Sequence, residues 1–229
     1  MFMALEDHFD LGFGATADSF RQAADVLQSH EADLELDDLR HLPENYLRRH
    51  ACELYLKSGI VIVHRSFGIH YGKNDPQGQP FVLVKKDWQP FHRVHTIGVL
   101  FAHWSAFIED NSRHLKLITG DDWSIPPKMR EWVALVDASD PQSTLFRYPT
   151  TKNRELDKAK SRLKPMPVKD IMPPGKKGGF LFLDRVRDIV KAYRTDAAPM
   201  GDVHVALRDL VQTLSHFHLL MRAKLTRGL

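Results

Sequence analysis

Histidine, which can bind metals and transfer protons, occurs 13 times among the 229 residues of this sequence. The spacing of His92 and His95 allows both to bind one metal, and His50 shares a helical face with Glu53. A carboxylate-bridged site in a helical bundle requires two helices that each carry Glu-x-x-His. In this sequence His50 precedes Glu53, which is the reverse of that order, and no second motif of this kind occurs. We therefore predict neither a metal nor a cofactor, and expect partly buried, hydrogen-bonded histidines.

The group His50, Glu53 and Lys57 has the spacing of one face of a helix. Glu53 precedes Lys57 by four residues, the favourable order for a surface ion pair that contributes about 0.3 kcal/mol. If Glu53 is instead partly buried, the pair would fix how two helices pack. Loss of one partner would then cost more than the pair contributes.

These residues belong to a predicted helix over residues 43–63, which begins with Pro43, a residue suited to the first helical turn. Cys52 lies on its apolar side, which is typical of a small buried side chain. The helix has one apolar stripe at the spacing i, i+4, i+7 and i+11, formed by Leu47, Ala51, Leu54 and Ser58.

Further apolar periodicity predicts helices that would surround this one. The ranges are 16–32, 95–117, 125–140, 182–195 and 202–225. Phe81–Val84 has the composition of a strand and is expected to be an extended loop or one arm of a small hairpin.

A basic segment follows Arg147 and Tyr148. Residues 147–177 hold ten Lys or Arg side chains against three Asp or Glu, together with several prolines and almost no periodicity. We interpret residues 150–179 as a flexible basic insertion. Such a segment either contacts a polyanion or is a solvated loop. Its candidate binding residues are Lys158, Lys160, Arg162 and Lys164.

Three sequence signals occur in a characteristic order: His50 to Lys57 with the pattern HxxELYLK, then His95 with Leu100, then Phe146–Pro149 with the sequence FRYP. In that order they resemble the HEPN superfamily, the higher eukaryote and prokaryote nucleotide-binding helical bundles. The resemblance covers about residues 15–220. Thr96 departs from the pattern, because an acidic residue is usual at that position.

The resemblance implies an all-α, antiparallel helical bundle formed as a single domain over residues 15–229, and a homodimer. It also implies a module that binds RNA or nucleotides, in stress response or phage defence. The binding residues would be His50, Glu53, Lys57, His95, Arg147 and Tyr148, with the basic insertion.

Catalytic members of this superfamily are metal-independent ribonucleases with an Arg-x4-6-His signature, in which the two side chains promote attack of a ribose 2′-hydroxyl on phosphate. The matching pair here is Arg65 and His70. It lies at the end of the ELYLK helix rather than on a later helix, where Arg65 also suits a helix C-terminus. A ribonuclease therefore remains one alternative, and a non-catalytic protein-interaction bundle is another.

Composition limits the remaining possibilities. Cys52 is the single cysteine, so an internal disulfide is excluded and a reducing compartment is favoured. The longest apolar run is far shorter than the roughly 20 residues of a membrane span. No secretory signal opens the sequence, and we therefore expect a cytoplasmic protein that does not enter a membrane.

Overall fold

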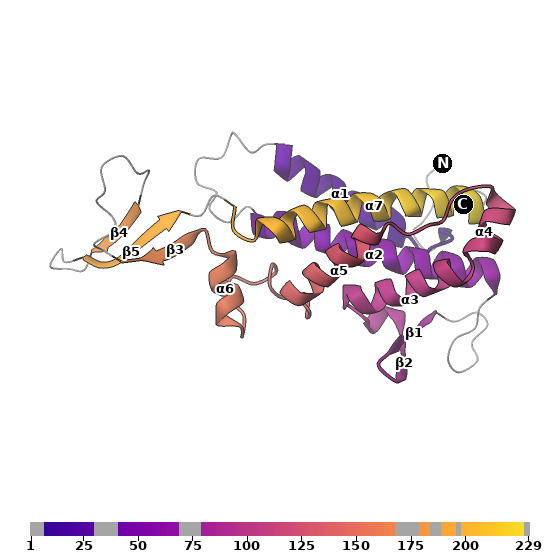
Figure 1. Ribbon diagram of the computed structural model, residues 1–229, viewed down its shortest axis with the longest axis horizontal. Helices are drawn as coiled ribbons and strands as arrows, with labels where there is room; N and C mark the ends of the chain where they lie inside the picture. The colour runs from indigo at the N-terminus through magenta and orange to yellow at the C-terminus, as the bar shows by residue number, and fades with distance from the viewer. Residues whose placement is uncertain are drawn as a thin grey trace.

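The computed structural model describes residues 7–29, 41–68, 79–167, 179–183, 189–195 and 198–226, and most of them are helical (Figure 1). The helices are α1 (Phe13–Ser29), α2 (His41–Phe67), α3 (Ile97–Asp110), α4 (Ser112–Thr119), α5 (Pro127–Ser139), α6 (Arg154–Lys160) and α7 (Gly201–Leu225). The strands are β1 (Phe81–Val84), β2 (Asp87–Pro90), β3 (Leu163–Met166), β4 (Gly179–Leu183) and β5 (Ile189–Thr195). A mostly helical bundle is thus confirmed, with a two-stranded sheet and a three-stranded sheet in addition. The three-stranded sheet was not predicted.

Helix α2 is the central element, with α1, α3 and α7 packed around it (Figure 1). Every residue from Ala51 to His64 is buried, not only the predicted stripe. A helix enclosed on all sides needs small or apolar residues around its circumference, and its charged residues require partners. The expectation of a surface ion pair between Glu53 and Lys57 is therefore wrong, because both side chains are buried.

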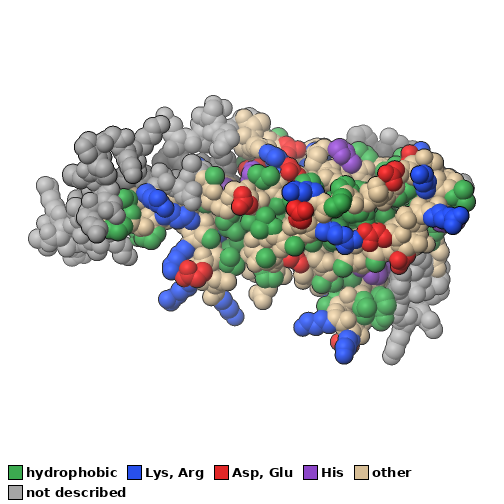
Figure 2. All heavy atoms as spheres, in the orientation of Figure 1, with side chains coloured by type: hydrophobic (Ala, Val, Ile, Leu, Met, Phe, Trp, Pro, Cys, Tyr) green, Lys and Arg blue, Asp and Glu red, His purple; other side chains and the backbone are tan. Residues whose placement is uncertain are grey.

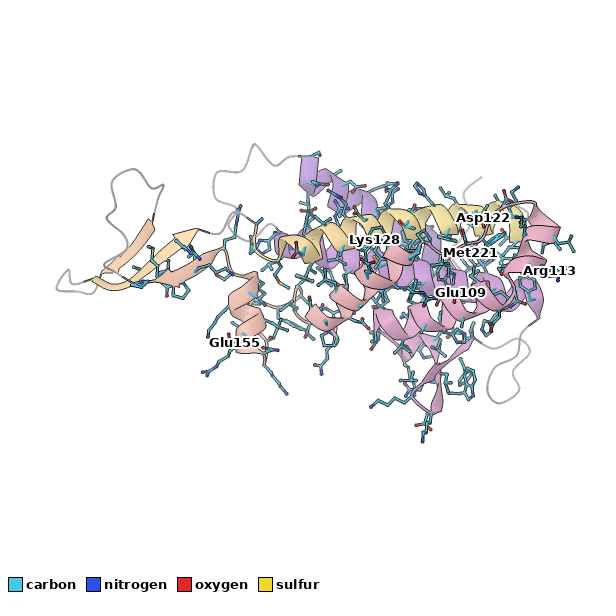
Figure 3. The ribbon with its side chains drawn as sticks, in the orientation of Figure 1. Glu109, Arg113, Asp122, Lys128, Glu155 and Met221 are labelled. Carbon is cyan, nitrogen blue, oxygen red and sulfur yellow. The ribbon has the colours of Figure 1, made fainter. Side chains whose placement is uncertain are left out.

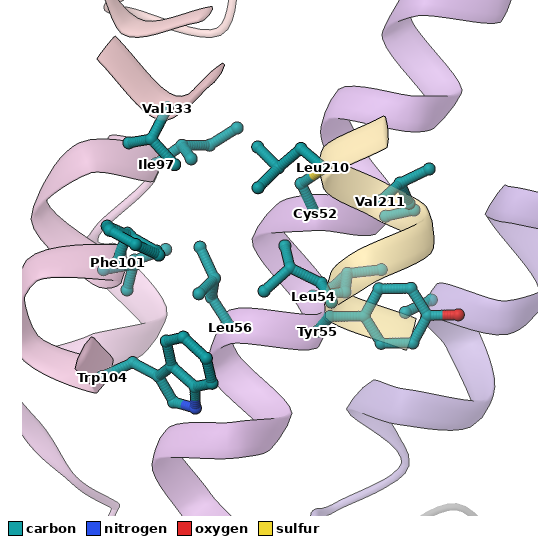
Figure 4. Packing of buried hydrophobic residues seen from close by; sticks show 14 of the residues in the cluster. Cys52, Leu54, Tyr55, Leu56, Ile97, Phe101, Trp104, Val133, Leu210 and Val211 are labelled. Carbon is teal, nitrogen blue, oxygen red and sulfur yellow. The ribbon is translucent and has the colours of Figure 1, made fainter. Parts of the chain in front are cut away.

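The apolar core lies between α2, α3 and α7 (Figure 4). Leu56 of α2 packs in the same cluster as Phe101 and Trp104 of α3, and Leu210 is contributed by α7. Cys52 belongs to this core, and burial raises the pKa of its thiol to about 12. Its predicted role as a small buried side chain is confirmed.

Polar contacts attach α1 to α2. The Tyr55 hydroxyl donates to Asp18 Oδ1 at 2.5 Å and accepts from Arg21 Nε at 3.3 Å. Burial and the Asp18 hydrogen bond raise the pKa of Tyr55 to about 12, so the phenol stays protonated and can act as donor. The contact sets the register of α1 along α2.

Several predicted helices have different limits. The range 95–117 is divided into α3 and α4 at Asn111, whose side-chain amide donates to the Phe107 carbonyl oxygen. Helix α5 ends before Asp140, as predicted, and α7 matches the predicted helix over 202–225. Within the described part of the chain, no helix has the length and apolar character needed to cross a bilayer.

Within the predicted helix over 182–195, the described residues 182–183 and 189–195 are strands instead, in β4 and β5. Strand β5 pairs antiparallel with β3 on one side and β4 on the other, with Lys164 opposite Arg194 and Phe180 opposite Tyr193. Four of the seven residues of β5 are aromatic or β-branched, and such residues favour strands once pairing partners exist. Of the two alternatives for Phe81–Val84, an extended loop or one arm of a hairpin, its antiparallel pairing with β2 confirms the hairpin.

The described half of the predicted insertion, residues 150–167, has regular structure. Asn153 caps α6 by accepting hydrogen bonds from the backbone nitrogens of Glu155 and Leu156, and β3 follows. Part of the predicted insertion is therefore a helix and a strand rather than an aperiodic segment. Its flexibility stays a prediction. Residues 168–178 lie outside the described part of the chain.

Candidate functional site

The carboxylate of Glu53 is the centre of a charged cluster inside the bundle. Its Oε1 atom lies 2.9 Å from Lys57 Nζ and 2.9 Å from His95 Nδ1, and its Oε2 atom accepts from Arg49 Nη1 at 3.3 Å. The Glu53 side chain is 3% exposed, whereas that of His95 is 60% exposed. The structure therefore brings three predicted binding residues together, of which only His95 reaches solvent.

Arg49 connects this cluster to two other elements. Its Nη2 donates to the backbone oxygen of His95 at 2.9 Å, directly before α3. Its Nε lies 3.2 Å from Asp140 Oδ2 in an ion pair that lacks hydrogen-bond geometry. Asp140 Oδ1 accepts from the backbone nitrogens of Thr144 and Leu145. Arg49 thus joins α2 to the start of α3 and to the segment after α5.

The charges of this cluster balance. Burial alone would raise the pKa of Glu53, but the Lys57 ammonium and the hydrogen bond from His95 outweigh it and lower that pKa. Glu53 and Asp140 therefore face Arg49 and Lys57 as two buried anions and two buried cations. Buried charges are tolerated when they are paired in this way.

Next to the cluster, His50 lies in a stack with Tyr46 and Arg147. The Tyr46 and His50 rings are parallel to within 4° with centroids 5.9 Å apart, and Arg147 Cζ lies 5.5 Å from the Tyr46 centroid. Burial lowers the pKa of His50; Glu53 opposes this shift, and Lys57 adds to it. The cation of Arg147 thus sits on an aromatic ring close to a neutral imidazole.

Lys160 is not available to a ligand. Its ammonium is 3% exposed and donates to the carbonyl oxygens of Leu145 and Tyr148 at 2.9 and 2.7 Å, with Asp157 Oδ1 at 3.0 Å. Each of the three N–H groups of the Lys160 ammonium therefore has an acceptor. Lys160 is therefore not the exposed nucleic-acid contact that its charge suggests, because it attaches the end of α6 to residues 145–148. Nothing in the spacing of the basic residues distinguishes it from its neighbours.

The other predicted basic residues differ in exposure. Lys158 is 64% exposed and pairs with Glu155, which extends from α6 (Figure 3). Lys164 is half-buried and its Nζ donates to the carbonyl oxygens of Lys158 and Ala159. Arg162 is also half-buried. Of these three, only Lys158 presents its charge fully to solvent.

A cavity of about 630 Å³ separates the segment after α5 from the start of α6. Asp140 and Thr144 line it on one side, and Lys152 and Arg154 line it on the other. Both basic residues are exposed. Figure 2 shows Lys and Arg side chains extending from the surface of α6. A cavity of this size with cations at its edge can accommodate a phosphate-bearing ligand.

Arg65, at the end of α2, makes contacts with Phe9 of the same chain. Its Nη1 donates to the backbone oxygen of Phe9 at 2.7 Å, and its guanidinium lies over the Phe9 ring. His70, its predicted catalytic partner, lies outside the described residues. In the described ranges, no group of three or more His, Cys, Asp or Glu side chains has the geometry of a metal site.

A serine, a histidine and an aspartate also meet, near the N-terminus of α1. Ser58 Oγ donates to Asp10 Oδ2 at 2.6 Å, and His218 Nε2 lies 3.3 Å from the same oxygen. Burial opposes ionisation of Asp10, but these two partners and the Gly14 amide hold its pKa well below the usual range. Both Ser58 and His218 point to the carboxylate, so the histidine cannot activate the serine, and the group is structural.

The chain matches no family model, no curated protein and no solved structure.

Proposed function

We propose that this chain is a HEPN-like module that binds RNA or nucleotides through a basic face. We define the basic face as five exposed residues of α6 and the segment before it: Arg147, Tyr148, Lys152, Arg154 and Lys158. Two of them, Lys152 and Arg154, line the cavity. The observation that carries the proposal is the position of this cavity. Asp140 lines it and pairs with Arg49, which contacts Glu53 and His95, so two of the three sequence signals are connected to the cavity.

The chemistry of the basic face suits a nucleic-acid backbone. Arginine can hold two phosphate oxygens at once, and lysine supplies a point charge. Tyr148 is 49% exposed and can stack on a base. Because phosphate contacts release counterions, binding that depends on these residues should weaken steeply with salt.

The test is RNA binding measured by fluorescence anisotropy at several salt concentrations. We expect the combined variant Arg147→Gln, Lys152→Gln, Arg154→Gln and Lys158→Gln to bind weakly, with a salt slope smaller by about 0.7 log units for each phosphate that is no longer neutralised. A control variant removes four exposed charges elsewhere: Lys85, Lys86, Arg113 and Lys116. Equally weak binding by both variants would contradict a defined basic face.

A metal-independent ribonuclease is the second candidate, and the observation that favours it is the position of His95. An exposed imidazole whose Nδ1 is held by a buried carboxylate has a defined orientation for proton transfer. RNA cleavage in EDTA would be compared for the wild type, His95→Gln and His70→Ala. Loss of cleavage only in His95→Gln would support proton transfer by His95. Loss of cleavage only in His70→Ala would support Arg65 and His70 as the catalytic pair.

A homodimer is part of the proposal, because related bundles often pair through their helices. Gel filtration with light scattering would test it at micromolar concentration. A strict monomer without RNA binding would favour the protein-interaction bundle instead.

A further inference from the structure

A groove of about 640 Å³ lies between α3 and the hairpin formed by β1 and β2, apart from the basic face. Leu83 and Trp88 of the hairpin line it, and each remains more than 40% exposed. Figure 2 shows hydrophobic side chains extending from this hairpin. Along α3 the groove is lined by Val99, His103 and Phe107 and by the small residues Ala102 and Ala106, which leave room for a thin, extended ligand. Asp137 fills the space beside Gly98.

A carboxylate lies near each end of the groove. Asp137 of α5 accepts a hydrogen bond from the Gly98 backbone nitrogen at 2.9 Å, which places it at the N-terminal end of α3. Asp110 is the last residue of α3 and is exposed. Asp137 Oδ1 is buried and has no hydrogen-bond partner among the described residues, so this atom can accept a further donor.

No lysine or arginine is among the described residues that line the groove. Its histidine, His103, is partly buried, which lowers its pKa, and its Nε2 lies 3.5 Å from His64 Nε2. The groove is therefore negative at both ends and uncharged in the middle at neutral pH. Phosphates and carboxylates would be repelled, whereas a cation would be attracted.

The length of the groove restricts the ligand further. Gly98 and Asp110 are 12 residues apart on α3, a distance of about 18 Å at the rise of an α-helix. An extended chain advances about 3.5 Å for every three bonds, so the 13 bonds of spermine span about 15 Å. Ammonium groups at the two ends of such a chain would reach both carboxylates.

We propose that this groove binds a linear aliphatic polyamine, with its terminal ammonium groups at Asp110 and Asp137. Its methylene groups would pack on Ala102 and Ala106, and the indole of Trp88 would attract an ammonium to its face. The site differs from the basic face in charge, so the proposal does not depend on RNA binding.

Isothermal titration calorimetry of the RNA-free protein with spermine tests the charge requirement. We expect Asp110→Asn to weaken binding about fivefold, the effect of one exposed ion pair. Glu131→Gln removes an exposed carboxylate of α5 that does not line the groove, and should bind as the wild type does. Equal weakening in both variants would show non-specific attraction to acidic residues and would overturn the proposal.

A second pair of variants tests whether the ligand occupies the space in the groove. Ala106→Leu fills the groove without changing charge, and Ala134→Leu makes the same change at an exposed position of α5 outside it. Both changes keep a strong helix former. We expect Ala106→Leu to lose spermine binding and Ala134→Leu to retain it. Retention in both, or putrescine binding as tightly as spermine, would overturn the proposal, because putrescine is too short to reach both ends.

Discussion

His95 is held by α2 at two points, through its side chain at Glu53 and through its backbone at Arg49. The His95 Nδ1 atom lies 2.9 Å from Glu53 Oε1, and the His95 carbonyl oxygen accepts from Arg49 Nη2 at 2.9 Å. Glu53 and Arg49 are one turn apart on α2 and also contact each other. The start of α3 is thereby attached to the centre of the bundle through polar contacts in addition to the apolar core.

Removing one charge of this cluster should destabilise the fold. Lys57→Met leaves the buried Glu53 carboxylate without its closest cation, and we expect a loss of about 3 kcal/mol in the free energy of unfolding. Urea unfolding measures it. Lys158→Met, at an exposed ion pair, should change stability by less than about 1 kcal/mol. The double variant Glu53→Gln with Lys57→Met should lose less free energy of unfolding than the sum of the losses in the two single variants. Strictly additive losses would contradict a coupled buried pair.

Stability should fall on mild acidification because of His50. Its pKa is lowered by burial, so below pH 6.5 the unfolded chain binds a proton at this site more readily than the folded chain does. The stability is fully present above pH 6.5 and is lost as the pH falls from there toward the folded pKa. Urea unfolding at pH 7.5 and pH 5.5 should show a smaller drop for His50→Gln than for the wild type. The exposed His216→Gln should retain the full drop.

Gly14 cannot tolerate a side chain. A Cβ atom at this position would lie 2.0 Å from His218 Nε2 and 2.6 Å from Asp10 Oδ2, both in a buried hydrogen-bonded group. Gly14→Ala should therefore destabilise the protein by about 2 kcal/mol, although alanine is the better helix former. At Gly201 the nearest atom would be 3.5 Å away, an ordinary contact. If Gly14→Ala and Gly201→Ala lower the thermal unfolding midpoint equally, the inference that Gly14 is closely packed is wrong.

Lys160 should matter for stability and Lys158 for binding. Lys160→Met would leave the carbonyl oxygens of Leu145 and Tyr148 without a donor, and we expect a loss of about 2 kcal/mol. Lys158→Met should leave the unfolding midpoint unchanged and weaken RNA binding. Thermal unfolding and anisotropy on the same samples separate the two effects. The reverse pattern would make Lys160 a ligand-binding residue and Lys158 a structural one.

Local sequence information was sufficient to predict most helices. The apolar period of α2, Pro43 near its start and the turn residues after α5 predicted where helices lie. It was also sufficient to predict that Cys52 is buried and that Glu53 has an ionic partner, because both inferences depend on neighbours within one turn of the same helix.

Tertiary structure decided what local patterns do not contain. Strand β5 exists through its pairing with β3 and β4, and a strand has no internal hydrogen bonds to reveal it. Arg49 meets Asp140 across 91 positions of the chain, and Lys160 is buried by residues 145–148, so exposure could not be deduced from charge. The sequence by itself determined which residues are charged and which helix carries them; only packing of distant elements decided which charges are buried in pairs and which reach solvent.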